Sequence, residues 1–171
     1  LHSHQEAESR LISGISARGH AETVEGLTHL IAAGVPVFVN FVFTRHTLDH
    51  AAPFVDWVAD TLGTAAQRVH VKLVFPSTSG KGGEWAGIAL TYEEVRPHLI
   101  AAMARGRARR LPVLTESFPN CVIGDPGRTN VGRSGFGETH YLDDLTGDRL
   151  YPIRTIEAAL TAYPETCRGC A

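Results

Sequence analysis

The chain has 171 residues and a formal net charge of −2; 43% of its residues are hydrophobic and 20% are charged. This composition predicts a globular domain with a substantial core, and it excludes a disordered or collagen-like chain. The near-neutral charge provides no basic face for nucleic acid. The apolar stretch at 34–44 is too short to span a bilayer, and no signal peptide is recognisable after Leu1. We therefore expect a cytoplasmic protein that has no contact with a membrane.

Helical and strand patterns alternate along the first 120 residues. We expect helices where apolar residues recur every three or four positions, and strands where β-branched and aromatic residues run together. In chain order these are a helix at 22–33, a strand at 35–43, a helix at 49–62 capped by Asp49, a strand at 69–75, a helix after the Thr91–Glu94 capping box, and a strand at 111–115. The first strand is apolar enough to be buried on both faces. The alternation predicts βαβ units that form a parallel sheet.

The remainder of the chain has a different character. Residues 124–150 are rich in Gly, Asp, Thr and Arg and show no clean period, which indicates a long loop or a small extension; a short helix is expected at 155–163. A Gly- and Ser-rich segment at 77–87 is expected to be a loop. We therefore expect a β/α domain over residues 1–120 and an irregular C-terminal extension over 121–171.

The three cysteines are the sharpest chemical feature. An odd number of cysteines in a cytosolic-looking chain favours thiolate chemistry over disulfides. Cys167-x-x-Cys170 can hold one metal or one cluster iron from a tight turn, which Gly169 permits. A cluster normally has four ligands, and Cys121 is a candidate for a third. The alternative is a chance pair of cysteines near the end of the chain.

A pair of histidines opens the chain. In His2-Ser3-His4 the two imidazoles lie on the same side of an extended segment, an arrangement suited to a divalent metal. It resembles the first motif of PHP-type metallophosphoesterases and of amidohydrolases. Those families also need an Asp-His pair after the next strand, where this chain has Arg45-His46 without an acidic partner. The alternative is that these histidines are ordinary polar residues.

Taken in order, several segments resemble the second half of the barrel of radical S-adenosylmethionine (SAM) enzymes. The segment at 1–4 resembles the phrase that ends the fourth strand of that family. The segment at 30–40 resembles the fifth strand with its Asn, and the segment at 71–76 resembles the sixth with its apolar-Pro step. Glu-Ser-Phe-Pro-Asn-Cys at 116–121 resembles a phrase of subfamilies that carry an additional cluster and often continue to a late C-x-x-C. The resemblance covers nearly the whole chain.

The resemblance implies an α/β fold, a partial (β/α) TIM-type barrel of parallel strands with flanking helices and an irregular C-terminal extension. It also implies an iron–sulfur oxidoreductase that cleaves SAM reductively and uses a [4Fe–4S] cluster. The C-x-x-x-C-x-x-C loop of that family does not occur in this chain, and its Gly-Gly-Glu motif, which follows the first two strands of the barrel, is expected upstream of Leu1; the Gly-Gly-Glu at 82–84 instead follows the segment that resembles the sixth strand. We therefore expect a fragment that is inactive alone and whose partner is the N-terminal half of the same barrel.

The same resemblance implies roles for individual residues. Those expected near SAM are Ser3, Asn40 and Phe75, those expected near a peptide or small-molecule substrate are His2, His4, Arg45 and Lys72, and those expected to hold an auxiliary [4Fe–4S] cluster are Cys121, Cys167 and Cys170. Asn40 is the least ordinary of them, because a buried amide in an apolar strand needs hydrogen-bond partners. Two other functions stay open: a PHP-type phosphoesterase that uses His2 and His4, and a non-catalytic metal-binding β/α module.

Overall fold

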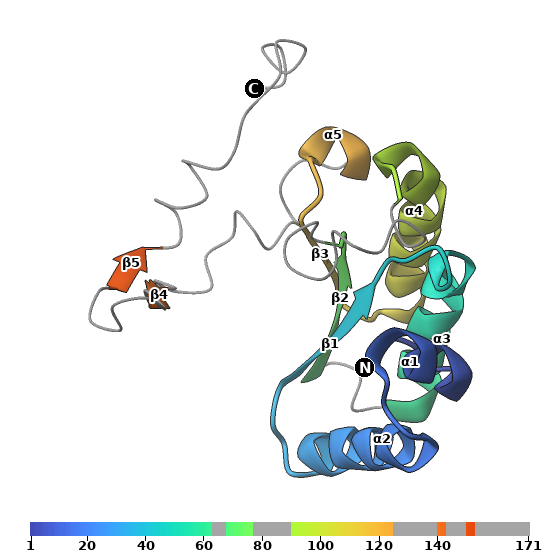
Figure 1. The fold of residues 1–171 in the computed structure, drawn as a ribbon, viewed down its shortest axis with the longest axis vertical. Coiled ribbons are helices and arrows are strands. Elements are labelled where there is room, and N and C mark those ends of the chain that lie inside the picture. Colours follow the sequence, from blue (N-terminus) through green and yellow to red (C-terminus); the bar gives the residue numbers. More distant parts are fainter. Residues whose placement is uncertain (63–67, 77–89, 125–139, 143–149, 153–171) are drawn as a thin grey trace. The chain divides into compact units, whose positions relative to one another are not determined.

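The structure is a computed structural model that describes residues 1–62, 68–76, 90–124, 140–142 and 150–152. Its internal contacts divide the chain into two units, Leu1–Gly132 and Arg133–Ala171. The elements of the first unit, in chain order, are α1 Glu6–Ser13, α2 Ala17–Ala32, β1 Val37–Val42, the 3₁₀ turn η1 Leu48–His50, α3 Ala51–Leu62, β2 Val69–Val74, α4 Tyr92–Arg109, β3 Val113–Glu116 and α5 Asn120–Ile123 (Figure 1).

The first unit is a mixed α/β structure built on a three-stranded parallel sheet. The strands are hydrogen-bonded in the order β1-β2-β3, so each strand lies beside the next one in the chain. Val37 is in register with Val69 on β2, and Val71 on β2 is in register with Val113 on β3. The expected parallel sheet with flanking helices is therefore confirmed, with strand boundaries within a few residues of those predicted.

One face of the sheet is covered by helices. α3 and α4 lie side by side on this face, as Figure 1 shows, and α2 contributes Leu27 and Ile31 to the same core. The strand side chains in this core are Val39, Phe41, Val69, Val71, Leu73 and Val113. Alternate residues of each strand point into the core, as the pleat of a strand requires.

The other face of the sheet is not covered by any described helix, and we call it the open face. Its side chains are those of Phe38, Asn40, Val42, His70, Lys72, Val74, Leu114 and Glu116. Phe38 is 43% exposed and Asn40 is also exposed. The prediction that β1 is buried on both faces was wrong, because the described helices cover only the face that carries Val39 and Phe41.

Two helices differ from the expected pattern. α2 begins at Ala17 rather than at residue 22, because the Ser16 hydroxyl accepts a hydrogen bond from the Gly19 N–H at 3.0 Å and caps the helix. α1 was not predicted. It ends at Gly14, whose φ of 68° is the left-handed conformation that favours glycine, and whose N–H donates to the Arg10 carbonyl.

α4 begins where the capping box predicts a helix and extends to Arg109. The capping box is present: the Thr91 hydroxyl accepts from the Glu94 N–H, and the Glu94 carboxylate accepts from the Thr91 N–H. Pro97 lies inside the helix without ending it. The helix therefore offers one long face to α3 and to the sheet.

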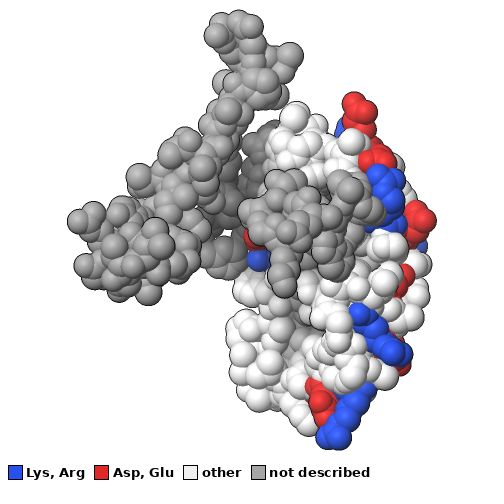
Figure 2. Space-filling view, in the orientation of Figure 1, with Lys and Arg blue, Asp and Glu red and all other residues white. Residues whose placement is uncertain are grey.

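The second unit contains a two-stranded antiparallel sheet, β4 His140–Leu142 paired with β5 Leu150–Pro152, with Tyr141 opposite Tyr151. The predicted loop at 77–87 and the predicted helix at 155–163 lie outside the described residues. No helix among the described parts of the chain is long and apolar enough to cross a bilayer. In Figure 2, Lys and Arg side chains alternate with Asp and Glu along the helical side of the molecule, without a broad patch of one sign in this view.

Candidate functional site

The carboxyl ends of the three parallel strands lie at one edge of the sheet. Val42 is in register with Val74, and Val74 is in register with Glu116. The pairing continues past the strands: the Phe43 N–H donates to the Val74 carbonyl at 3.0 Å, and the Phe75 N–H donates to the Glu116 carbonyl at 3.1 Å. Ligands of β/α proteins bind at this edge. The candidate site therefore comprises this carboxyl edge and the open face beside it.

An aromatic cluster lies at the carboxyl edge. The rings of Phe75 and Tyr92 have centroids 4.2 Å apart, and Phe118 lies 5.5 Å from Phe75 and 6.2 Å from Tyr92. Phe43 connects this cluster to the core through an edge-on contact with Phe118 at 5.8 Å. Tyr92 is 37% exposed and Phe75 is partly exposed. The cluster can therefore pack against a planar ring.

Tyr92 of the aromatic cluster lies near two further residues with unusual features, Ser117 and Cys121. The Tyr92 hydroxyl donates to the Ser117 carbonyl at 3.4 Å, and Ser117 has a φ of 64°, which is unusual for a residue other than glycine. Burial raises the pKa of Tyr92, and the negative charge of the Cys121 thiolate adds to this effect. Cys121 is exposed and free. α5, which follows β3, thus places an exposed thiol near the aromatic cluster.

Asn40 and Lys72 lie next to each other on the open face. They are register partners on β1 and β2, and the Lys72 ammonium forms an ion pair with the Glu116 carboxylate of β3. The amide of Asn40 was expected to be buried, and that expectation was wrong, because its side chain lies on the uncovered side of the sheet and is exposed. An amide, an ammonium and a carboxylate are therefore presented together on this face.

Arg45 extends from the turn after β1 toward the first turn of α4. Its guanidinium pairs with the Glu94 carboxylate at 3.2 Å. The pKa of Glu94 is lowered, mainly by the hydrogen bond from the Thr91 backbone and then by the Thr91 side chain, with a smaller contribution from Arg45. Arg45 is thus held at the carboxyl edge by a residue that also caps α4.

Ser3 is fully buried and has a structural environment. Its hydroxyl donates to the Glu8 carboxylate at 2.5 Å and accepts from the Gln5 N–H at 3.0 Å. Its carbonyl accepts from the Ser9 hydroxyl at 3.0 Å and lies 3.3 Å from Nε2 of His20. These bonds fix the first residues of the chain to α1 and α2.

His4 packs against η1 and α3. Its ring lies about equally far from Phe54 and Trp57, at 6.1 Å each, and 6.2 Å from His50. His50 in turn forms an ion pair with Glu8. The Nδ1 atom of His4 is buried and has no hydrogen-bond partner. Burial is the largest cause of its lowered pKa.

The metal candidates are only partly within the described structure. Cys167 and Cys170 lie outside the described residues, and Cys121 lies at the carboxyl edge. His2 resembles His4, since its Nδ1 is buried without a partner and burial lowers its pKa. Among the residues described, no three His, Cys, Asp or Glu side chains gather in a way that can hold a metal ion. The two histidines therefore gain no third ligand from this part of the chain.

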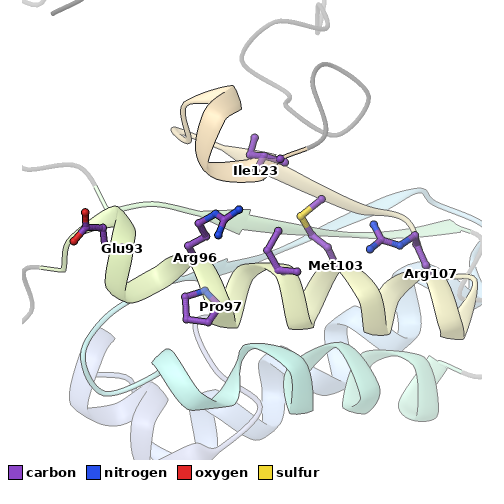
Figure 3. A pocket seen from close by; sticks show the side chains of 8 residues that line it. Glu93, Arg96, Pro97, Met103, Arg107 and Ile123 are labelled. Atoms are coloured by element: carbon purple, nitrogen blue, oxygen red, sulfur yellow. The ribbon is translucent and has the colours of Figure 1, made fainter. Parts of the chain in front are cut away.

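A hollow of about 880 Å³ lies apart from these residues, between α4 and α5. Arg96 and Met103 extend from α4 toward Ile123 of α5, and Arg107 lies further along α4 (Figure 3). None of the predicted site residues lines this hollow. Its size alone therefore gives it no role in the candidate site.

The structure adds Glu116, Tyr92, Glu8 and His50 to the residues that the sequence singled out. Glu116 was detectable from the sequence, because it directly follows the predicted strand at 111–115. Its side chain alternates with core-facing side chains, as that of Lys72 does in β2. Tyr92 follows the recognised N-cap Thr91 directly. Glu8 and His50 are joined only by tertiary packing, which no local pattern signals.

The chain matches no family model, and comparisons with curated proteins and with solved structures gave no match. The functional argument therefore rests on the residues and their geometry.

Proposed function

We propose that this chain is the C-terminal half of a radical SAM enzyme, an iron–sulfur oxidoreductase whose partial (β/α) barrel holds SAM and substrate against the open face. The observation that carries the proposal is this face. Three parallel strands in sequence order are covered by helices on one side, and their other side presents Asn40, Lys72 and Glu116.

The strand order and the helices on one face are those of a barrel segment and also of one half of a doubly wound sheet, and the resemblance to radical SAM enzymes favours the barrel. In doubly wound sheets helices cover both faces, and the strand order reverses at a switch point. In a (β/α) barrel each strand lies beside the next in sequence, the helices form an outer ring, and the inner face receives polar side chains near the ligand. The order β1-β2-β3, with α3 and α4 on one face, fits the second arrangement.

The side chains at the site fit SAM. The exposed amide of Asn40 can both donate and accept hydrogen bonds, and the partly exposed ring of Phe75, supported by Tyr92, suits the adenine ring. The hydroxyl of Ser3 is engaged by Glu8 and by the Gln5 N–H. In this proposal Ser3 positions the first residues of the chain, and its contact with SAM is not required.

The substrate side of the proposal uses the same edge. Arg45 lies there in its ion pair with Glu94, and Lys72 lies on the open face, while His2 and His4 are half-buried in the N-terminal segment. When bound, SAM and a reduced [4Fe–4S] cluster supply one-electron chemistry that removes a hydrogen atom from the substrate. The residues of this chain orient both molecules and exclude water from them.

An auxiliary [4Fe–4S] cluster is part of the proposal. The exposed thiol of Cys121 at the carboxyl edge is accessible to a metal, and thiolates are the ligands that iron–sulfur clusters prefer. Cys167 and Cys170 supply two further thiolates from the C-terminal part of the chain. The fourth ligand then comes from another residue of the full-length protein or from the substrate.

The substitution Asn40→Ala tests the proposal through SAM affinity. Loss of a hydrogen-bonding amide is expected to weaken SAM binding by the full-length protein about five- to tenfold, the equivalent of one well-made hydrogen bond. Equilibrium dialysis with radiolabelled SAM measures this change. The matched control is Thr61→Ala, which removes an exposed polar side chain from α3 on the covered side of the sheet. Equal affinity of the Asn40 variant and the wild-type protein would contradict the role assigned to this face.

A further inference from the structure

The open face carries one pair of opposite charges on a largely uncharged surface. Its neighbours include the apolar side chains of Phe38, Val42 and Leu114. Among the described side chains of this face, Lys72 and Glu116 are the ones with formal charges at neutral pH. The pair therefore lies among apolar side chains and the two uncharged polar side chains of Asn40 and His70.

The pair reaches across two strands. Lys72 on β2 is in register with Leu114 on β3, whereas Glu116 is in register with Val74. The ammonium therefore reaches diagonally toward the carboxyl edge to meet the carboxylate. The two side chains keep 20% and 40% of their surface exposed. A partly exposed pair of this kind contributes modestly to folding stability, and its charges remain accessible to a ligand from the open face.

The charges select among ligands. An anion that approaches Lys72 is repelled by Glu116, and a cation that approaches Glu116 is repelled by Lys72. A group that carries both charges close together can meet both residues, its carboxylate at the ammonium and its ammonium at the carboxylate. In an α-amino-acid group the ammonium and the carboxylate are bonded to the same carbon atom. Their close spacing matches two oppositely charged side chains that are in contact with each other.

Asn40 strengthens this match. It lies beside Lys72 in register on the neighbouring strand, at the spacing of about 4.8 Å that separates paired strands. Its amide can donate to a carboxylate that is bound at Lys72. One row of the face thus offers two donors to a carboxylate, and the diagonal neighbour offers an acceptor to an ammonium. The rings of Phe38 and His70 lie beside this row, with centroids 4.9 Å apart and planes tilted by 34°.

We propose that Lys72, Glu116 and Asn40 bind the zwitterionic α-amino-acid group of a ligand on the open face, with the carboxylate at Lys72 and Asn40 and the ammonium at Glu116. This inference rests on the proposed function, in which the open face looks onto the bound molecules. The zwitterion has two sources in that setting: a substrate that is an amino acid, or the amino-acid part of SAM. The chemistry of recognition is the same for both.

The test uses the full-length protein with its clusters and a reversal of the pair. The double variant Lys72→Glu with Glu116→Lys keeps one ion pair but exchanges its ends, so a structural role is preserved and zwitterion recognition is not. Lys72→Met removes the positive charge alone. The matched control reverses an ion pair on the helical side of the sheet, between Asp56 of α3 and Arg105 of α4. In this pair Nε of Arg105 lies 3.1 Å from a carboxylate oxygen of Asp56.

Two probes distinguish the sources. For the cofactor, S-adenosylhomocysteine carries the amino-acid group and 5′-methylthioadenosine is a nucleoside thioether that lacks it. For the substrate, a mixture of free L-amino acids is followed by saturation-transfer NMR. We expect the reversed pair and Lys72→Met to weaken binding of one zwitterionic probe at least about tenfold, which corresponds to one charge-assisted contact. Binding of 5′-methylthioadenosine and the melting temperature of the reversed variant are expected to stay near wild type.

The inference is overturned if the reversed pair binds both zwitterionic probes as the wild-type protein does, or if the wild-type protein binds neither. A loss confined to S-adenosylhomocysteine assigns the pair to the cofactor, and a loss confined to the amino acids assigns it to the substrate. SAM cleavage by the wild-type protein is measured in the same preparation. If the wild-type protein cleaves SAM but the reversed pair does not change the binding of either zwitterionic probe, this inference is rejected and the proposed function stands. If the wild-type protein does not cleave SAM, the proposed function is rejected.

Discussion

His4 has a buried ring nitrogen, Nδ1, that lacks a hydrogen-bond partner. Its ring also lies near the Glu8 carboxylate and near two other histidines, His50 and His20. Burial lowers its pKa from the ordinary 6.5; the nearby Glu8 carboxylate acts in the opposite direction, and His50 and His20 act in the same direction as burial. Because the folded-state pKa lies below the unfolded-state value, the unfolded chain binds the proton more readily. The stabilising effect of neutral His4 is therefore complete above pH 6.5 and is lost as the pH falls through the folded-state pKa.

The substitution His4→Phe tests this linkage. Phenylalanine keeps a ring of similar size against Phe54 and Trp57 and removes the titration, so the free energy of unfolding is expected to fall less between pH 7 and pH 5 than in the wild-type protein. Urea unfolding at several pH values measures the slope. His29→Gln, at a side chain that is 73% exposed, should keep the wild-type slope. A slope in the His4 variant equal to that of the wild type would show that other groups carry the pH dependence.

Single residues were predictable from the sequence only where their neighbours in the chain determine their environment. Thr91 and Glu94 form a capping box whose partners lie three residues apart, and the structure contains it. The surroundings of Asn40 depend on which face of the sheet the helices cover, and the pattern of β1 alone did not reveal this. Ser3 is buried by Glu8, Ser9 and His20, contacts that arise when α1 and α2 pack on the N-terminal segment.

At the level of elements, the contact between α4 and β3 depends on Gly106. A Cβ atom built at this position lies 2.2 Å from Cγ2 of Val113 and 3.0 Å from the carbonyl oxygen of Leu111. The helix can approach the strand this closely because the residue has no side chain. By contrast, a Cβ atom at Gly26 in α2 has no heavy atom within 4 Å.

The two glycines give a matched pair of substitutions. Gly106→Ala is expected to lower the free energy of unfolding by about 1–3 kcal/mol, the usual cost of overpacking a core. Gly26→Ala is expected to raise it by about 0.5–1 kcal/mol, because alanine has the higher helix propensity and meets no neighbour. Chemical denaturation of both variants measures the changes. Equal effects in the two helices would contradict the close approach of α4 to β3.

The elements themselves were predictable to different degrees. β1 was recognised because β-branched and aromatic residues dominate it, and β2 and β3 because β-branched residues recur at alternate positions in them. α1 was missed because only Leu11 and Ile12 among its residues are large and apolar, so no helical period is visible. Gly14, which ends the helix in a left-handed conformation, was the local signal available for it.

For the molecule as a whole, the central structural fact is that the helices described by the structure cover one face of the sheet. Leu11 of α1, Leu30 of α2, Val35 before β1 and Phe38 on the open face are large apolar side chains that are between 43% and 57% exposed. Exposed apolar surface beside the outer strand β1 is expected where a further β/α unit packs. In the proposed barrel, that unit belongs to the N-terminal half of the enzyme. The substrate could not be predicted from the sequence, since its identity depends on side chains that several strand ends and loops bring together.

Reductive cleavage of SAM by the full-length protein, purified and reconstituted with iron and sulfide without oxygen, is the most direct test of the proposed function. With a strong reductant and SAM, we predict that chromatography with mass detection shows methionine and 5′-deoxyadenosine in equal amounts, and that the protein is brown from its clusters. A colourless protein that binds zinc or manganese, hydrolyses phosphoesters and forms no 5′-deoxyadenosine would contradict the account and favour the phosphoesterase alternative.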